Sequence, residues 1–85
     1  MSLDANFKTS CEEVKKFTKR PPDSEMLEIY SLYKQATVGD TNIPKPSDAK
    51  SKMKWEAWNK KKGMSGNTAK EEYIAKVKSL APTYA

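Results

Sequence analysis

Apolar residues recur every three or four positions in four stretches of the chain, which is the spacing of a helix with one buried face. A run of prolines ends the first stretch at Arg20, because the residue before a proline is disfavoured in helical conformation. The pattern therefore predicts a first helix over about Leu3 to Phe17. Its apolar positions are Leu3, Phe7, Cys11, Val14 and Phe17.

Capping residues mark the second predicted helix. Asp23 follows the proline run and suits the N-cap, where a short carboxylate accepts backbone N–H groups. The helix then continues to Val38, and Gly39 supplies the left-handed residue that commonly ends a helix. The segment over 40–48 contains two prolines and is predicted to be a loop.

Two further helices are predicted after this loop. The third runs from about Ala49 to Lys62 and stops at Gly63. Ser65 suits the N-cap of the fourth, which Pro82 interrupts near its end. The buried face of the fourth helix is predicted to carry Ala69, Tyr73, Val77 and Leu80.

These patterns predict an all-α fold, a bundle of four helices. Short connections predict that the first and second helices, and likewise the third and fourth, are antiparallel neighbours. The longer middle loop allows a crossover. No internal repeat interrupts the pattern, so we expect residues 1–85 to form a single domain.

Two stripes lie side by side on the second predicted helix, as follows from about 100° of rotation per residue. The apolar stripe consists of Ile29, Leu32 and Ala36, and the other consists of Tyr30, Tyr33, Lys34 and Thr37. Ammonium groups pair with phosphate and tyrosine rings accept a planar base. The second stripe therefore favours a phosphorylated aromatic ligand, such as a nucleotide.

The charge favours an anionic partner. The chain has 85 residues, with 16 Lys plus Arg against 11 Asp plus Glu, for a net charge of +5. Acidic residues are interspersed among the basic ones, so the charge alone does not name that partner. A chain this short buries little volume, so a sizeable ligand is expected in a groove between helices.

Several kinds of chemistry are excluded by composition. Histidine is absent, which removes His-based general bases and His-liganded metals, and the single Cys11 makes neither a disulfide nor a thiolate cluster. We expect no enzymatic activity, no metal and no cofactor. The chain has no apolar run long enough to span a membrane, and MSLDANFK lacks the apolar core of a secretory signal. We expect a cytoplasmic monomer.

Each candidate binding residue also has a purely structural interpretation. Trp55 and Trp58 are interpreted first as core or groove-wall residues, with Trp58 packed behind a functional lysine. The run 60–62 is interpreted as a solvated helix end. Lys50 and Lys54 stack on one face, where two like charges invite an anion, but spacing alone leaves plain solvation open. Tyrosines commonly line a core and leave the hydroxyl exposed, and this structural interpretation comes first for Tyr30, Tyr33 and Tyr73.

The order and spacing of these segments resemble the acyl-CoA-binding protein family over nearly the whole chain. The residues that carry the resemblance are Phe7, Glu12-Glu13-Val14-Lys15, Met26-Leu27, YSLYKQATVGD at 30–40, Lys50, KWEAWN at 54–59, Gly63 and EEYIAKV at 71–77. The resemblance implies an up-down-down-up bundle that binds medium- to long-chain fatty acyl-CoA esters without catalysis. It also implies carriage and buffering of these esters in the cytosol.

The resemblance also implies residue roles. Lys34, Lys54 and the Tyr30 hydroxyl match positions that hold the 3′-phosphate of CoA. Tyr33 and Tyr73 match positions near the adenine, Lys15 and Lys50 match positions near the phosphates, and Met26 and Leu27 match positions near the acyl chain. Contacts with acyl-CoA-using enzymes or membranes are expected to be transient.

One segment departs from the family pattern. Between Pro46 and Lys50 the chain has only Ser47-Asp48-Ala49, about two residues fewer than usual and without bulky apolar side chains. We hypothesise that this shortening changes the preferred length of the acyl chain.

Two other functions compete with this interpretation. Nucleic acid binding is disfavoured, because no recognised motif is present and acids interrupt the basic face. A basic helical interaction module, or an adaptor for anionic membranes, is the stronger alternative, since lysine-rich amphipathic helices serve both purposes. Loss of the Tyr30, Tyr33 and Lys34 stripe distinguishes them: a CoA binder needs it and a membrane adaptor does not.

Overall fold

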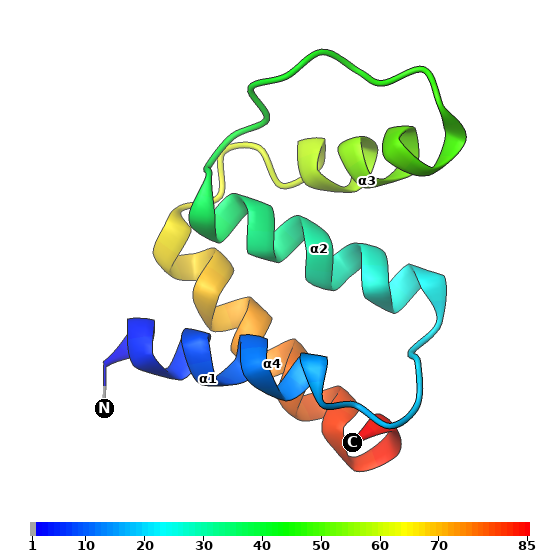
Figure 1. The fold of residues 1–85 in the computed structure, drawn as a ribbon. Coiled ribbons are helices and arrows are strands. Elements are labelled where there is room, and N and C mark those ends of the chain that lie inside the picture. Colours follow the sequence, from blue (N-terminus) through cyan, green and yellow to red (C-terminus); the bar gives the residue numbers. More distant parts are fainter. Residues whose placement is uncertain (1) are drawn as a thin grey trace.

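The computed structural model describes residues 2–85, which form four α-helices. The helices are α1 Leu3–Lys15, α2 Asp23–Thr37, α3 Ala49–Asn59 and α4 Gly66–Tyr84. The predicted all-α fold is confirmed, and Figure 1 shows that α2 and α3 run opposite to α1 and α4, in the expected up-down-down-up order.

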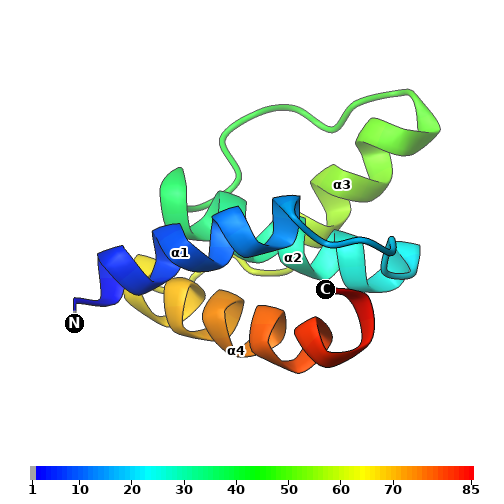
Figure 2. The ribbon, with the colours of Figure 1, turned by 60° about the horizontal axis from the view of Figure 1, so that its bottom comes forward.

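The helix pairs that pack directly in residues 2–85 are α2 with α4, α1 with α4, and α2 with α3. Helices α1 and α2 are antiparallel, as are α3 and α4 (Figure 1), but the prediction that their backbones lie side by side is wrong, although the Phe7 and Tyr33 rings of α1 and α2 stack. The reason is that α4 presents one long apolar stripe to both α1 and α2. Figure 2 shows α3 standing apart from α1 and α4.

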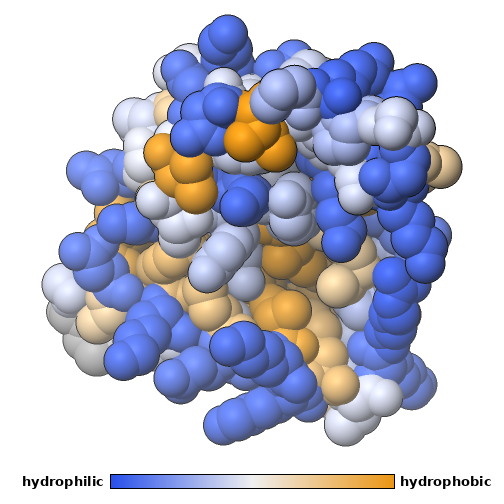
Figure 3. Space-filling model, turned by 45° about the horizontal axis from the view of Figure 1, so that its top comes forward, coloured by the Kyte–Doolittle hydropathy of each residue, from blue (hydrophilic) through white to orange (hydrophobic). Residues whose placement is uncertain are grey.

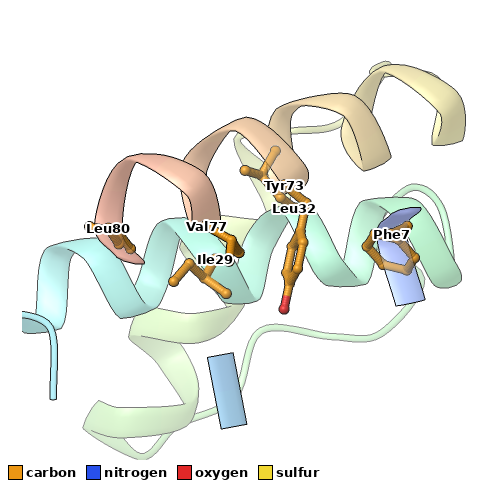
Figure 4. Packing of buried hydrophobic residues seen from close by; sticks show 6 residues of the cluster. All are labelled: Phe7, Ile29, Leu32, Tyr73, Val77 and Leu80. Carbon is orange, nitrogen blue, oxygen red and sulfur yellow. The ribbon is translucent and has the colours of Figure 1, made fainter. Parts of the chain in front are cut away.

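The core lies where α1, α2 and α4 meet. Figure 4 shows its buried residues, which are Phe7, Ile29, Leu32, Tyr73, Val77 and Leu80. The predicted apolar stripes of α2 and α4 supply most of this set, since Ile29 and Leu32 come from one and Tyr73, Val77 and Leu80 from the other. Cys11 is half-buried and packs against the core, as its place in the first apolar stretch suggests.

Several helix ends are confirmed by their capping bonds. Ser65 Oγ accepts the N–H of Thr68 at 3.1 Å, as expected for the N-cap of α4. Asp48 caps α3 in the same way, accepting the N–H of Ser51 at 3.0 Å, and hydrogen bonding to Ser51 lowers the pKa of the Asp48 carboxyl. Gly39 and Gly63 both have positive φ, 98° and 92°, in the left-handed region expected of each stop.

Other ends differ from the predictions. Helix α1 ends at Lys15 rather than Phe17, although Phe17 still packs against the core. Pro22, not Asp23, is the N-cap of α2, and Asp23 is the first helical residue. Helix α3 ends at Asn59, so 60–62 form a turn rather than the last turn of the helix.

Pro82 does not interrupt α4, which continues to Tyr84. A proline removes one backbone donor and crowds the preceding turn. Pro82 lies so near the end of the helix that only one turn is affected, and its side chain is exposed. The Tyr84 carbonyl is also held from outside the helix, because it accepts the N–H groups of Thr18 and Lys19 at 2.9 and 3.1 Å.

Candidate functional site

A groove of about 390 Å³ lies between the first half of α2 and the first half of α3. It is lined by Arg20, Asp23, Met26, Leu27 and Tyr30 on one side and by Lys50, Met53 and Lys54 on the other. The structure thus brings together five of the nine residues that the sequence singled out for ligand binding. They are Met26, Leu27, Tyr30, Lys50 and Lys54.

The positive charge of this groove is uncompensated on the α3 side. Neither Lys50 nor Lys54 forms an ion pair with any of residues 2–85. The ammonium of Lys54 lies 5.6 Å from the centroid of the Tyr30 ring, over its face. Unpaired ammonium groups on the edge of a groove favour an anionic ligand.

Lys34 lies one helical turn beyond Tyr30, and its ammonium is 5.0 Å from the centroid of the Trp58 ring. Trp58 is only 2% exposed, and its indole N–H donates to the carbonyl of Gly39 at 2.8 Å. Trp58 thus packs behind Lys34, as predicted, while the functional role of that lysine stays a prediction. The buried indole holds Lys34 on the same face of α2 as Tyr30.

Tyr33 and Tyr73 belong to a separate aromatic cluster with Phe7. The ring centroids of Tyr33 and Phe7 are 6.1 Å apart, and those of Tyr33 and Tyr73 are 6.3 Å apart. Tyr33 is 43% exposed, whereas Tyr73 is 3% exposed. Burial raises the pKa of the Tyr73 hydroxyl, with further contributions from Cys11 and Tyr33, so this phenol stays neutral. The exposed ring of Tyr33 therefore packs on the buried ring of Tyr73.

Lys15 is the predicted site residue that lies apart from the others. It is exposed in the last turn of α1, and it lines neither this groove nor the aromatic cluster. A bound ligand would have to extend beyond the groove to reach its ammonium. This separation is not visible in the residue pattern, because the packing of the helices decides it.

Sequence reasoning missed three residues of the groove: Arg20, Asp23 and Met53. Arg20 Nη1 donates to Asp23 Oδ1 at 2.7 Å, so this pair forms one wall without adding net charge. Met53 is 50% exposed and stands between Lys50 and Lys54 on the same side of α3. An apolar residue between two groove lysines is the signal that identifies Met53.

Lys61 is not solvated as predicted. Its ammonium donates to Glu28 Oε2 at 2.7 Å and is largely covered, so it ties the turn after α3 back to α2. Lys60 and Lys62 are exposed, as expected.

The middle loop lies against another side of α3. The indole N–H of Trp55 donates to the Ile43 carbonyl at 2.9 Å, and Lys45 lies over the Trp55 ring, 5.9 Å from its centroid. None of residues 41–48 lines the groove. Trp55 thus packs against the middle loop and belongs neither to the core nor to the lining of the groove.

The arrangement suits an amphipathic anion, because it joins a cationic rim to an apolar floor. Figure 3 shows the mixed character of this side of the molecule, where hydrophilic residues surround apolar ones. No group of His, Cys, Asp or Glu side chains in the described part of the chain could hold a metal ion. None of the helices in residues 2–85 has both the length and the apolar character needed to cross a bilayer. The fold and the groove define a small helical ligand-binding protein.

Comparison with known proteins identifies the family. The family model for Acyl CoA binding protein matches residues 4–77. The acyl-CoA-binding protein homolog of Drosophila melanogaster is 52% identical over 85 residues, covering 98% of this chain and 99% of its own.

Solved structures agree with this match. The crystal structure of Oryza sativa acyl-CoA-binding protein 2 superposes with a TM-score of 0.91 at 35% identity, over 95% of this chain and 92% of that one. The solution structure of the acyl coenzyme A binding protein from yeast superposes with a TM-score of 0.75 at 44% identity, over 92% of this chain and 93% of that one. This chain belongs to the acyl-CoA-binding protein family.

Proposed function

We propose that this protein binds medium- to long-chain fatty acyl-CoA esters and carries and buffers them in the cytoplasm, without catalysing a reaction. The observation that carries the proposal is the groove between α2 and α3, in which Met26 and Leu27 adjoin Tyr30, Lys50 and Lys54. The groove thus has an apolar part and a cationic part. An acyl-CoA ester has two matching parts, because it joins a multiply charged nucleotide to an apolar tail.

In the proposed complex the 3′-phosphate of CoA lies between Lys34 and Lys54 and accepts a hydrogen bond from the Tyr30 hydroxyl. Both ammonium groups lie over aromatic rings, and neither is paired with a carboxylate of residues 2–85. A phosphate therefore displaces no internal partner when it binds, and charge-assisted hydrogen bonds of this kind are worth about 1.5–3 kcal/mol each.

The adenine stacks on the exposed ring of Tyr33. Tyr73 contributes from beneath, as the buried support of Tyr33, since so little of its own surface is free. Lys50, on the groove rim, faces the remaining phosphates, and Lys15 meets them from the end of α1. The tail begins at Met26 and Leu27, where each methylene removed from water contributes about 0.8 kcal/mol.

The remaining parts of the proposal concern the chain as a whole. Residues 1–85 act as one acyl-CoA-binding domain, as a monomer, with no cofactor. Absence of histidine from the sequence removes the commonest general base, which supports a purely binding role. Contacts with acyl-CoA-using enzymes or with membranes are transient.

Calorimetric titration with palmitoyl-CoA, free CoA and free palmitate tests the proposal. Tight binding of the thioester, with much weaker binding of either half, is expected because the groove receives both head and tail. Equal binding of palmitate would refute a CoA-dependent site. Vesicles of anionic lipid provide a second arm: binding to them that survives loss of Tyr30, Tyr33 and Lys34 would support the membrane-adaptor alternative instead.

A further inference from the structure

Two exposed aliphatic side chains lie outside the ligand site, in the stretch that leads from α2 into the middle loop. Val38 is 48% exposed and Ile43 is 51% exposed. The other large apolar residues of comparable exposure, Tyr33 and Met53, belong to the aromatic cluster and to the groove. Single exposed aliphatic residues are common, so the meaning of this pair depends on the residues that surround it.

Hydrogen bonds hold the middle loop against α3. Thr41 Oγ1 donates to Asn59 Oδ1 at 2.8 Å, and the Ile43 carbonyl accepts the indole N–H of Trp55 at 2.9 Å. Figure 1 shows this loop on the outer side of α3, away from α1 and α4. Since Ile43 is held through its backbone, the fold fixes its side chain in an exposed position.

Lysines accompany Ile43 on this side of α3. Lys45 lies over the Trp55 ring, and Lys52 precedes Trp55 by three positions and Asn59 by seven, which places it on the same face of the helix. Lys52 is exposed and forms no ion pair with any of residues 2–85. We call Ile43, Lys45 and Lys52 the loop face.

The loop face is separate from the ligand groove. A second groove, of about 370 Å³, also lies between α2 and α3, and Leu27 and Met53 line both grooves. None of residues 38–48 lines either groove, and neither does Lys52. A contact made at the loop face therefore leaves both grooves open.

Most of the net charge belongs to the same part of the chain. Residues 38–62 contain seven lysines and three acidic residues, a net charge of +4 out of +5 for the whole sequence. Figure 3 looks onto this end of the molecule and shows apolar residues set among hydrophilic ones. The asymmetry of charge turns this end toward an anionic surface.

The aliphatic side chains distinguish between kinds of anionic surface. A nucleic acid offers phosphates to lysines but gives Ile43 no apolar environment. A lipid interface offers both, because anionic headgroups lie above hydrocarbon. A protein partner is disfavoured, since residues 38–48 contain no aromatic residue and no arginine, the types that most often anchor protein interfaces.

We propose that the loop face makes a transient contact with anionic lipid bilayers, from which the groove collects acyl-CoA esters and to which it delivers them. The inference rests on the proposed function and names the surface that touches the membrane. Even together, the side chains of Val38 and Ile43 are much smaller than a myristoyl chain, which alone gives only marginal, reversible attachment. The protein is therefore not retained on vesicles, in contrast to the membrane-adaptor alternative.

Transfer of palmitoyl-CoA from the protein to vesicles tests the contact. Loaded protein is mixed rapidly with vesicles of phosphatidylcholine, with or without phosphatidylserine, and release is followed by tryptophan fluorescence. If transfer requires collision, its rate rises with vesicle concentration, whereas release into water makes the rate independent of it. Phosphatidylserine should raise the transfer rate by about tenfold at low salt, because it attracts the loop face.

Three variants assign this effect to the loop face. Ile43→Ser removes the apolar side chain and keeps the carbonyl that holds Trp55, and Lys52→Glu reverses one charge. The matched control is Lys78→Glu, the same change at an exposed position of α4 that has no ion pair within residues 2–85.

Ile43→Ser and Lys52→Glu should lose most of the gain in rate that phosphatidylserine gives, and Lys78→Glu should retain it. Calorimetry should show the same palmitoyl-CoA affinity in all three variants as in the wild type. A transfer rate independent of vesicle concentration, or equal losses in Lys52→Glu and Lys78→Glu, would overturn the assignment. Failure of palmitoyl-CoA to bind the wild type would instead refute the proposed function itself.

A measurement on the ligand-free protein tests the contact without reference to acyl-CoA. The methyl resonances of Ile43 should lose intensity when anionic vesicles containing spin-labelled phosphatidylcholine are added, because relaxation detects brief encounters. The methyl resonance of Ala75, exposed on α4, should not change. Equal losses at both positions would overturn the assignment, and so would no loss at Ile43, which would favour an acidic protein surface as the partner of the loop face.

Discussion

The two sides of α2 are held by different kinds of interaction. Toward α4 and α1, α2 contributes Ile29 and Leu32 to a continuous buried cluster. Toward α3, the partner helix supplies only one buried residue, Trp58. Directional bonds also act on this side, among them that of Trp58 to the Gly39 carbonyl and that of Lys61, in the turn after α3, to Glu28.

This difference separates stability from binding. Apolar burial, which favours folding in proportion to area, is concentrated in the α1–α2–α4 body. The α2–α3 pair leaves its facing side chains in open grooves, so a ligand can complete an apolar surface that the protein does not cover itself. We therefore expect substitutions in the body to change the free energy of unfolding and substitutions around the grooves to change affinity.

The largest effect is expected in the body. Leu32 is 1% exposed, and Leu32→Ala should lower the free energy of unfolding by about 2–5 kcal/mol, because a buried side chain is replaced by a cavity. Urea denaturation measures the change. The exposed Val38→Ala is the control and should cost little. A loss of palmitoyl-CoA affinity in folded Leu32→Ala, without loss of stability, would contradict the claim that the α1–α2–α4 body determines stability and the grooves determine affinity.

A smaller effect, on ligand affinity and not on stability, is expected at Lys54. Lys54→Ala should weaken palmitoyl-CoA binding by about 1.5–3 kcal/mol, roughly tenfold or more, because a charge-assisted contact to phosphate is lost. Its thermal midpoint should not fall, since Lys54 makes no ion pair within residues 2–85. Lys52→Ala changes charge equally at an exposed position outside both grooves and is the control. Equal losses in the two variants would indicate only general attraction.

Trp58 joins the two regions and should affect both. Trp58→Phe removes the N–H that donates to Gly39 and shortens the ring beneath Lys34. We expect a loss of about 1–3 kcal/mol in the free energy of unfolding, because the change leaves a carbonyl unpaired. Affinity for palmitoyl-CoA should fall as well. Trp55→Phe, which removes an indole bond to the loop, should leave affinity unchanged; equal effects of the two variants would contradict the role given to Trp58.

The smallest effect concerns Asp40, which ties α2 to the turn before α4. Its Oδ1 accepts hydrogen bonds from the Gly63 N–H at 2.8 Å and from Gln35 Nε2 at 2.9 Å. The Gly63 bond, followed by that of Gln35, lowers the pKa of this carboxyl below its ordinary value of 3.8. A lowered pKa in the folded state stabilises the protein above the unfolded pKa, and that stability is lost as pH falls through the folded pKa.

Thermal midpoints measured from about pH 6 down to about pH 2 test this dependence. The midpoint of the wild type should fall more steeply in acid than that of Asp40→Asn, whose side chain cannot be protonated in this range. If the thermal midpoints of the two proteins fall in parallel as the pH is lowered, Asp40 does not contribute to the loss of stability in acid.

Much of the fold follows from local sequence, because caps and apolar spacing act within a few residues. Ser65 and Gly39 predicted helix ends correctly, and the apolar stripe of α4 is its buried face. Gly63 has the expected positive φ, but α3 ends earlier, at Asn59. The prediction at Pro82 is wrong, because this proline removes one backbone donor near the end of α4 without ending the helix, which continues to Tyr84.

Tertiary packing decides what the local pattern leaves open. The run 60–62 consists of three lysines, yet of these only Lys61 forms an ion pair with Glu28. Likewise, Met53 and Arg20 are groove residues because α3 packs on α2 beside the connection from α1. Residue spacing singled out Lys50 and Lys54, and it placed Tyr73 on the apolar face of the fourth helix and Tyr33 on the polar stripe of the second, in agreement with their burial.

Amide hydrogen exchange with and without palmitoyl-CoA tests most directly whether α3 and its grooves are the binding region. Helix α3 is held by few buried contacts, so its amides should exchange faster than those of α4 in the free protein and should be strongly protected by the ligand. Protection gained mainly in α1 and α4, with α3 unchanged, would contradict the assignment of binding to α3.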